Sequence, residues 1–177
     1  MTNTKREEKI KKVISKRQEG IIVFEDIHDL HNVAASCRSA DGFGFQKIYL
    51  IFENEKSFNP KKTGKTSSGS ANKWLDFKIF KSTKECLEEL KKDGFEIWAT
   101  VLDEKAVKIS KADFTKEKIA VMFGNEHRGL SKEAIRGTDK KVYIPMKGMV
   151  QSFNLSVSAA IVMYEINRQR EAARGVK

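Results

Sequence analysis

Residues 20–52, GIIVFEDIHDLHNVAASCRSADGFGFQKIYLIF, contain one complete strand–helix–strand unit. The apolar run IIVFEDI at 21–27 is rich in β-branched residues, which is typical of a strand buried on both faces. The segment 32–40 favours a helix that ends before Gly42, and KIYLIF at 47–52 predicts the next strand. Because a helix joins two buried strands, the unit predicts parallel pairing in an α/β sheet.

The same alternation continues on both sides of this unit. Further strands are expected at 77–80, 95–102, 119–123 and 141–146, and helices at 4–18, 84–92, after a capping Ser131, and at 153–170. The pattern indicates a mostly parallel sheet with helices on both faces. The one linker-like stretch, 53–74, lies inside the alternation, so we interpret it as an inserted binding loop of a single domain.

Charge and composition restrict the function. The 177 residues carry 34 Lys+Arg and 24 Asp+Glu, a net charge of +10. Segment 1–20 has seven Lys+Arg against three Glu, and segment 54–84 has eight Lys against two acids. Such blocks favour a polyanionic partner, and the alternative is a set of solvated helix faces.

Several classes of protein are not expected. Two cysteines and three histidines argue against a disulfide framework and against a metal site. No apolar run approaches the roughly 18–20 residues of a membrane span, and MTNTKREEKIKK lacks the apolar core of a signal peptide, so a cytoplasmic protein is expected. Gly42-Phe43-Gly44 and Gly64-Lys65-Thr66 lack the glycine spacing and the following helix of nucleotide-binding motifs.

Three polar, glycine-containing segments follow predicted strands. They are HNVAASCRSADGFG at 31–44, VMFGNEHRGLS at 121–131 and IPMKGMVQSFNLSVSAA at 144–160. Parallel strands end at one edge of a sheet, where ligands bind, so we expect the three segments to converge on one site.

The order and content of these segments resemble the SpoU class of the SPOUT RNA 2′-O-ribose methyltransferases. The first motif of that class pairs an Asn with an Arg six residues later, here Asn32 and Arg38. The second motif is matched at 124–131 by Gly-Asn-Glu-x-x-Gly-Leu-Ser, and the third is matched from Ile144 to Ser156. The resemblance covers about residues 20–170. The basic N-terminal helix and TSSGSANKW at 66–74 resemble the branch that methylates a D-loop guanosine at tRNA position eighteen.

The resemblance implies a fold, a cofactor and partners that periodicity does not give. It implies one SPOUT methyltransferase domain over 1–177, with a basic helix at 1–19 and a core at 20–177 whose C-terminal segment forms a deep trefoil knot. It implies S-adenosyl-L-methionine as cofactor, tRNA as substrate and a homodimer. The segment 153–166 is apolar nearly all round, which agrees with burial on more than one face; the alternative is a central helix of a monomer.

The resemblance also assigns residues. The catalytic set is Arg38, Asn32, Glu126, Ser152 and Asn154, and the cofactor set is Thr100, Gly124, Asn125, Ile144, Met146, Ser152 and Phe153. Arg38 would hold a phosphate and stabilise the developing oxyanion, because a guanidinium normally only donates. Glu126 would fix Arg38 or a backbone N–H. Simpler roles stay open: helix capping for Asn32, Ser152 and Asn154, turns for the glycines, and core packing for Ile144 and Met146.

Two other functions remain open at this point. The same chemistry could act on ribosomal RNA or at another tRNA position, which the three motifs do not distinguish. The chain could also be a non-catalytic RNA-binding protein of the same fold, although the intact motif residues argue against that.

Overall fold

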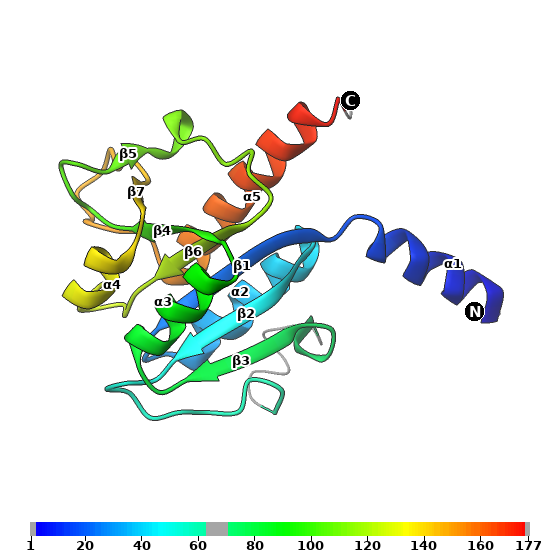
Figure 1. Ribbon diagram of the computed structural model, residues 1–177, viewed down its shortest axis with the longest axis horizontal. Helices are drawn as coiled ribbons and strands as arrows, with labels where there is room; N and C mark the ends of the chain where they lie inside the picture. Colours follow the sequence, from blue (N-terminus) through cyan, green and yellow to red (C-terminus); the bar gives the residue numbers. More distant parts are fainter. Residues whose placement is uncertain (1–2, 63–70, 176–177) are drawn as a thin grey trace.

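A computed structural model describes residues 3–62 and 71–175 as a parallel sheet between two layers of helices (Figure 1). The strands are β1 (Gln18–Glu25), β2 (Phe45–Ile51), β3 (Asp76–Phe80), β4 (Glu96–Thr100), β5 (Val107–Lys108), β6 (Ile119–Phe123) and β7 (Lys140–Tyr143). Their order is β3-β2-β1-β6-β4-β7-β5, and each neighbouring pair is parallel. The α/β class with a mostly parallel sheet is therefore confirmed.

Alternate residues of the central strands enter two separate cores. The helices are α1 (Asn3–Ile14), α2 (Leu30–Gly42), α3 (Thr83–Lys92), α4 (Lys132–Gly137) and α5 (Leu155–Ala173). Ile22 and Phe24 of β1 belong to the core that includes residues of α2 and α5, whereas Ile21 and Val23 belong to the core under α3 and α4. Successive side chains of a strand point to opposite faces, so a continuous apolar run serves both layers.

Several predicted elements end elsewhere in the structure, and two of them end three or four residues early. The strand expected at 141–146 ends at Tyr143, because Pro145 has no N–H for a sheet ladder. The helix expected at 4–18 ends at Ile14, and Gly20 lies inside β1 rather than after a helix. A Cβ at Gly20 would lie 2.5 Å from the Phe45 ring, so this glycine lets the ring pack on the strand.

Other elements agree closely with the sequence. The strand at 119–123 has the expected bounds, and Ser131 caps α4 by accepting a hydrogen bond from the N–H of Ala134. The two-residue edge strand β5 was not predicted, since it is too short to show a period. Within the inserted loop, residues 63–70 lie outside the described part of the chain, and Ala71–Lys73 form a 3₁₀ turn.

Helix α1 projects away from the sheet (Figure 1), and Ile10, Val13 and Ile14 on it are 43–51% exposed. These three side chains form a narrow apolar stripe that the rest of the described chain covers only in part. No helix in the described ranges is long and apolar enough to cross a membrane.

Candidate active site

The second motif forms a tight turn immediately after β6. The N–H of Asn125 donates to the carbonyl of Gly129 at 3.1 Å, and the N–H of Gly129 donates back at 2.8 Å. Gly129 has φ +69°, and a Cβ at Gly124 would lie 2.1 Å from the backbone N of Leu130. Both glycines are therefore required by the backbone path of the turn.

The turn is fixed to β1 by two side chains. Asn125 Nδ2 donates to the carbonyl of Asp26 at 2.7 Å. The N–H and the Oγ of Ser131 each donate to the carboxylate of the buried Glu25, both at 2.7 Å. The position of the second motif is thus set by the end of β1, which leads into the first motif.

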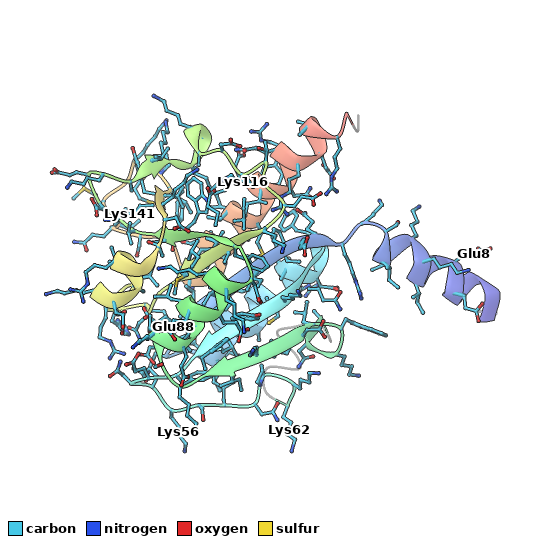
Figure 2. The ribbon with its side chains drawn as sticks, viewed as in Figure 1. Glu8, Lys56, Lys62, Glu88, Lys116 and Lys141 are labelled. Carbon is cyan, nitrogen blue, oxygen red and sulfur yellow. The ribbon has the colours of Figure 1, made fainter. Side chains whose placement is uncertain are left out.

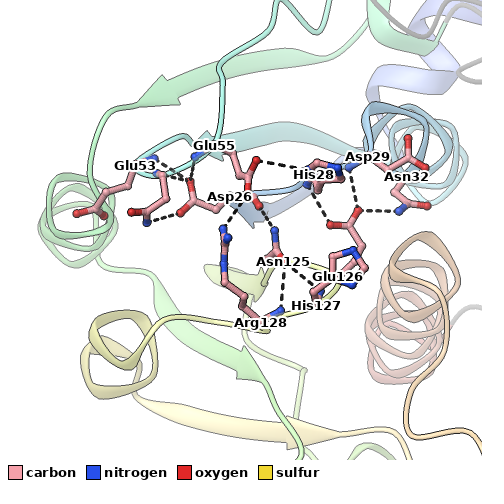
Figure 3. Close-up of polar contacts among 11 residues, drawn as sticks. Asp26, His28, Asp29, Asn32, Glu53, Glu55, Asn125, Glu126, His127 and Arg128 are labelled. Carbon is pink, nitrogen blue, oxygen red and sulfur yellow. Dashed lines mark hydrogen bonds and ion pairs between the residues drawn. The ribbon is translucent and has the colours of Figure 1, made fainter.

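Glu126 is held over the start of α2 (Figure 3). Its carboxylate accepts from Asn32 Nδ2 at 2.7 Å, from the N–H of His28 at 3.0 Å and from the N–H of Asp29 at 3.3 Å. Burial raises the pKa of Glu126, but these donors outweigh burial and hold the pKa below its usual 4.5. Glu126 therefore remains ionised at neutral pH.

Asn32 connects all three motifs. Asn154 Nδ2 donates to Asn32 Oδ1 at 2.9 Å, while Asn32 Nδ2 donates to the carboxylate of Glu126. Asn154 also caps α5, because its Oδ1 accepts from the N–H and Oγ of Ser156. The capping role left open for Asn32 belongs instead to Asp29, whose carboxylate accepts from the N–H of His31. The expected convergence of the three segments is observed.

Arg38 stands apart from this chain of hydrogen bonds. It lies six residues, about 1.7 turns, along α2 from Asn32. Its side chain is exposed, and it makes no hydrogen bond or ion pair with another residue in the described ranges. Of the two roles expected for Glu126, fixing Arg38 or fixing a backbone N–H, the structure shows the second, since Glu126 accepts from the N–H groups of His28 and Asp29 and from Asn32. The Arg38 guanidinium is free to meet a ligand.

A cavity of about 130 Å³ lies beside Asn154, between the ends of β4 and β7 and the start of α5. Five of the seven residues expected to bind the cofactor line it: Thr100, Ile144, Met146, Ser152 and Phe153. Val142 and Val162 complete an apolar wall. Gly124 and Asn125 do not line it, because they form the turn after β6 and the polar atoms of Asn125 are engaged there.

Comparisons with known proteins agree with this geometry. A family model described as the SpoU rRNA methylase family matches residues 19–164. The chain belongs to the SpoU methylase family. A relative from Aquifex aeolicus, named tRNA (guanosine(18)-2′-O)-methyltransferase, is 38% identical over 168 residues, covering 94% of this chain and 78% of the relative.

Solved structures give the same family. The crystal structure of the A. aeolicus TrmH/SpoU tRNA modifying enzyme superposes with a TM-score of 0.85 at 30% identity and covers 99% of this chain and 87% of that one. The SpoU methyltransferase AviRb from Streptomyces viridochromogenes, in complex with the cofactor AdoMet, has a TM-score of 0.77 at 25% identity and covers 90% and 64%. The S-adenosylmethionine (AdoMet) expected from the sequence is therefore the cofactor of this family.

The SpoU motifs alone do not reveal Asp26, which the structure brings into the site. Its carboxylate accepts hydrogen bonds from the N–H groups of Glu53, Asn54 and Glu55 and from Asn54 Nδ2. Its backbone has φ +50°, a conformation that Asp tolerates better than most residues. Charged residues inside the otherwise apolar run 21–27 were the available signal. No group of three His, Cys, Asp or Glu side chains in the described ranges could hold a metal ion.

Proposed function

We propose that this chain is a 2′-O-ribose methyltransferase that acts on tRNA, most specifically on a D-loop guanosine at position eighteen. The observation that carries the proposal is the hydrogen-bond chain Glu126–Asn32–Asn154, which joins the three SpoU motifs beside the cavity at Ser152 and Phe153. The name of the A. aeolicus relative supports the choice of tRNA. A tRNA substrate implies a cytoplasmic location.

The residues divide into a cofactor wall and a substrate side. When bound, S-adenosylmethionine supplies a methyl group on a sulfonium, which is itself the leaving group. Ile144, Met146 and Phe153 would enclose the adenine with apolar surface, while Ser152 offers a short hydrogen-bonding group.

On the substrate side, Arg38 would hold an RNA phosphate and stabilise charge that develops on the ribose oxygen. Asn32 and Glu126 fix the start of α2 and so set the direction in which Arg38 extends. Orientation of the hydroxyl toward the methyl group lowers the barrier. As the new O–C bond forms and the C–S bond of the sulfonium breaks, the hydroxyl proton passes to solvent. Gly124 and Asn125 act through the turn that they build.

We further propose a homodimer in which the exposed stripe of α5 meets a second copy of the chain. Val157 is 44% exposed and Tyr164 is 54% exposed, and they lie about two turns apart on one face of a helix whose opposite face is buried. Apolar side chains aligned on one helix face favour a protein partner. The C-terminal segment would also form the trefoil knot that the family resemblance implies.

The function is tested by mapping the product. Unmodified tRNA is incubated with the protein and methyl-labelled S-adenosylmethionine, digested, and analysed by mass spectrometry. We expect 2′-O-methylguanosine at D-loop position eighteen. Because the matched family is described as acting on rRNA, a parallel reaction with ribosomal RNA is the control. Ribose methylation of rRNA alone would overturn the substrate, a methylated base would overturn the chemistry, and RNA binding without transfer would indicate a non-catalytic protein.

A further inference from the structure

Six carboxylates lie near the turn of the second motif, and one differs from the others. The other five accept hydrogen bonds from backbone N–H groups: Glu25, Asp26, Asp29, Glu53 and Glu126. Within the described ranges, Glu55 accepts only from side chains, namely Arg128 Nη2 at 2.9 Å and His28 Nδ1 at 3.4 Å (Figure 3). The five backbone-bound carboxylates are structural, whereas Glu55 fixes an exposed cation.

Arg128 is held at both ends. Its backbone N–H donates to Asn125 Oδ1 at 3.1 Å inside the rigid turn, and its guanidinium donates to Glu55. The side chain is nevertheless 58% exposed. A guanidinium has five N–H donors. Only one of them is engaged by a residue in the described ranges, so an orientated fork remains available for a second anion.

The free N–H groups of Arg128 are close in the chain to the residues of the active site. Arg128 is two residues from Glu126, which binds Asn32. On its other side, Glu55 leads into the inserted loop, where Lys56, Lys61 and Lys62 are exposed; Figure 2 shows Lys56 and Lys62 at the lower edge of the molecule. Asp26 ties the start of this loop to the sheet through the N–H groups of 53–55. Arg128 is thus linked through the turn to the active site and through Glu55 to the start of a lysine-containing loop.

We propose that Arg128 binds a backbone phosphate of the substrate RNA beside the target nucleotide, and that Glu55 is the positioning residue that orients it. The inference rests on the proposed RNA substrate and adds a contact to it. A planar guanidinium can bridge a carboxylate and a phosphate with different N–H groups, which a lysine ammonium does less well. The paired carboxylate keeps the arginine extended before RNA arrives, so less side-chain entropy is lost on binding.

The experiment compares Arg128→Ala with Arg136→Ala, which removes the same charge from an exposed site on α4. Filter binding of unmodified tRNA is measured from 50 to 300 mM salt, together with KM, kcat, affinity for S-adenosylmethionine and melting temperature. Loss of one charged contact should weaken tRNA binding about tenfold. It should also flatten the log–log salt slope by roughly 0.7–0.9. KM for tRNA should rise with little change in kcat, and cofactor affinity and melting temperature should stay unchanged.

Glu55→Gln tests the positioning role. It should raise KM for tRNA about threefold, the size of a modest coupling energy between two contacting residues. In the Arg128→Ala background the same change should leave KM for tRNA unaltered, because Glu55 then has no arginine to orient. Tighter tRNA binding by Glu55→Gln would overturn the positioning role, because Glu55 would then be a competitor of the phosphate.

The remaining outcomes separate this inference from the proposed function. If Arg128→Ala and Arg136→Ala give the same affinity and salt slope while the wild type methylates tRNA, the Arg128 contact is wrong and the function stands. If the wild type transfers no methyl group but Arg128→Ala alone weakens RNA binding, the contact stands and the enzymatic function fails.

Discussion

At the scale of single residues, Arg38 is the clearest case: its side chain is exposed and has no hydrogen-bond or ion-pair partner in the described ranges. Replacing it with alanine therefore leaves no buried group unpaired, and the free energy of unfolding should change by less than about 0.5 kcal/mol. Methyl transfer should be abolished, because the phosphate beside the ribose loses its anchor. Circular dichroism melting and calorimetric titration with S-adenosylmethionine should match the wild type. Loss of cofactor affinity with surviving turnover would show that Arg38 has a structural role.

Acid should weaken the site through its hydrogen-bonded carboxylates. Burial raises the pKa of Asp26 and of Glu126, but donor hydrogen bonds outweigh it and hold each pKa below its usual value, 3.8 and 4.5. The unfolded chain then binds more protons, so their contribution is complete at pH 7 and is lost as pH falls below about 4.5. The melting-temperature gap between wild type and Asp26→Asn or Glu126→Gln should narrow as pH falls from 6 to 3. A constant gap would contradict this.

At the scale of single elements, Gly124 and Gly148, both in SpoU motifs, can be compared by the space around them. A Cβ at Gly124 would lie 2.1 Å from the N of Leu130 and 2.2 Å from the C of Gly129, and both are backbone atoms that cannot turn aside. A Cβ at Gly148 would meet nothing within 4 Å. Gly124→Ala should cost about 2–4 kcal/mol of unfolding free energy, whereas Gly148→Ala should be nearly neutral. Denaturant unfolding of the two variants is the measurement, and equal costs would contradict the model of the turn.

The elements also differ in how far sequence predicts them. The β1–α2–β2 unit could be predicted because its two apolar runs, the helical segment between them and the glycine at the end of that segment all indicate the same strand–helix–strand order. The meeting of Asn32, Glu126 and Asn154 followed from three motifs at one sheet edge. The end of the last long strand at Tyr143 was missed because the apolar run continues through Ile144 to Met146, which line a cavity instead of a sheet. Glu55 and Arg128 were missed because their pairing across 73 residues leaves no periodic signal.

At the scale of the whole molecule, the exposed stripe on α5 predicts self-association. Val157→Glu places a charge in the proposed interface, where an unpaired buried charge is costly, and should raise the dimer dissociation constant at least tenfold. Ile79→Glu on edge strand β3, where the apolar side chain is 47% exposed, is the control and should leave the dimer intact. Sedimentation velocity at several concentrations distinguishes them. A wild type that sediments as a monomer with full cofactor affinity would overturn the homodimer.

The projecting helix α1 carries basic residues that we expect to contact RNA, in a protein whose net charge is +10. Lys11, Lys12 and Lys16 are exposed on or just after a helix that stands away from the sheet (Figure 1), so they can follow a phosphate backbone beyond the active site. Reversing all three to Glu should weaken tRNA binding, and each lost contact should flatten the log–log salt slope by roughly 0.7–0.9. Affinity for S-adenosylmethionine should not change.

A control with the same change in net charge separates a local contact from general attraction. Lys91, Lys111 and Lys132 are exposed on the surface of the domain away from α1. Replacing all three with Glu removes the same six units of positive charge. If α1 contacts RNA, only the first triple variant shows the flattened slope, because counterions are released at sites of contact and not across the whole surface. Equal slopes in the two variants would mean that the lysines of α1 act only through the overall field of the protein.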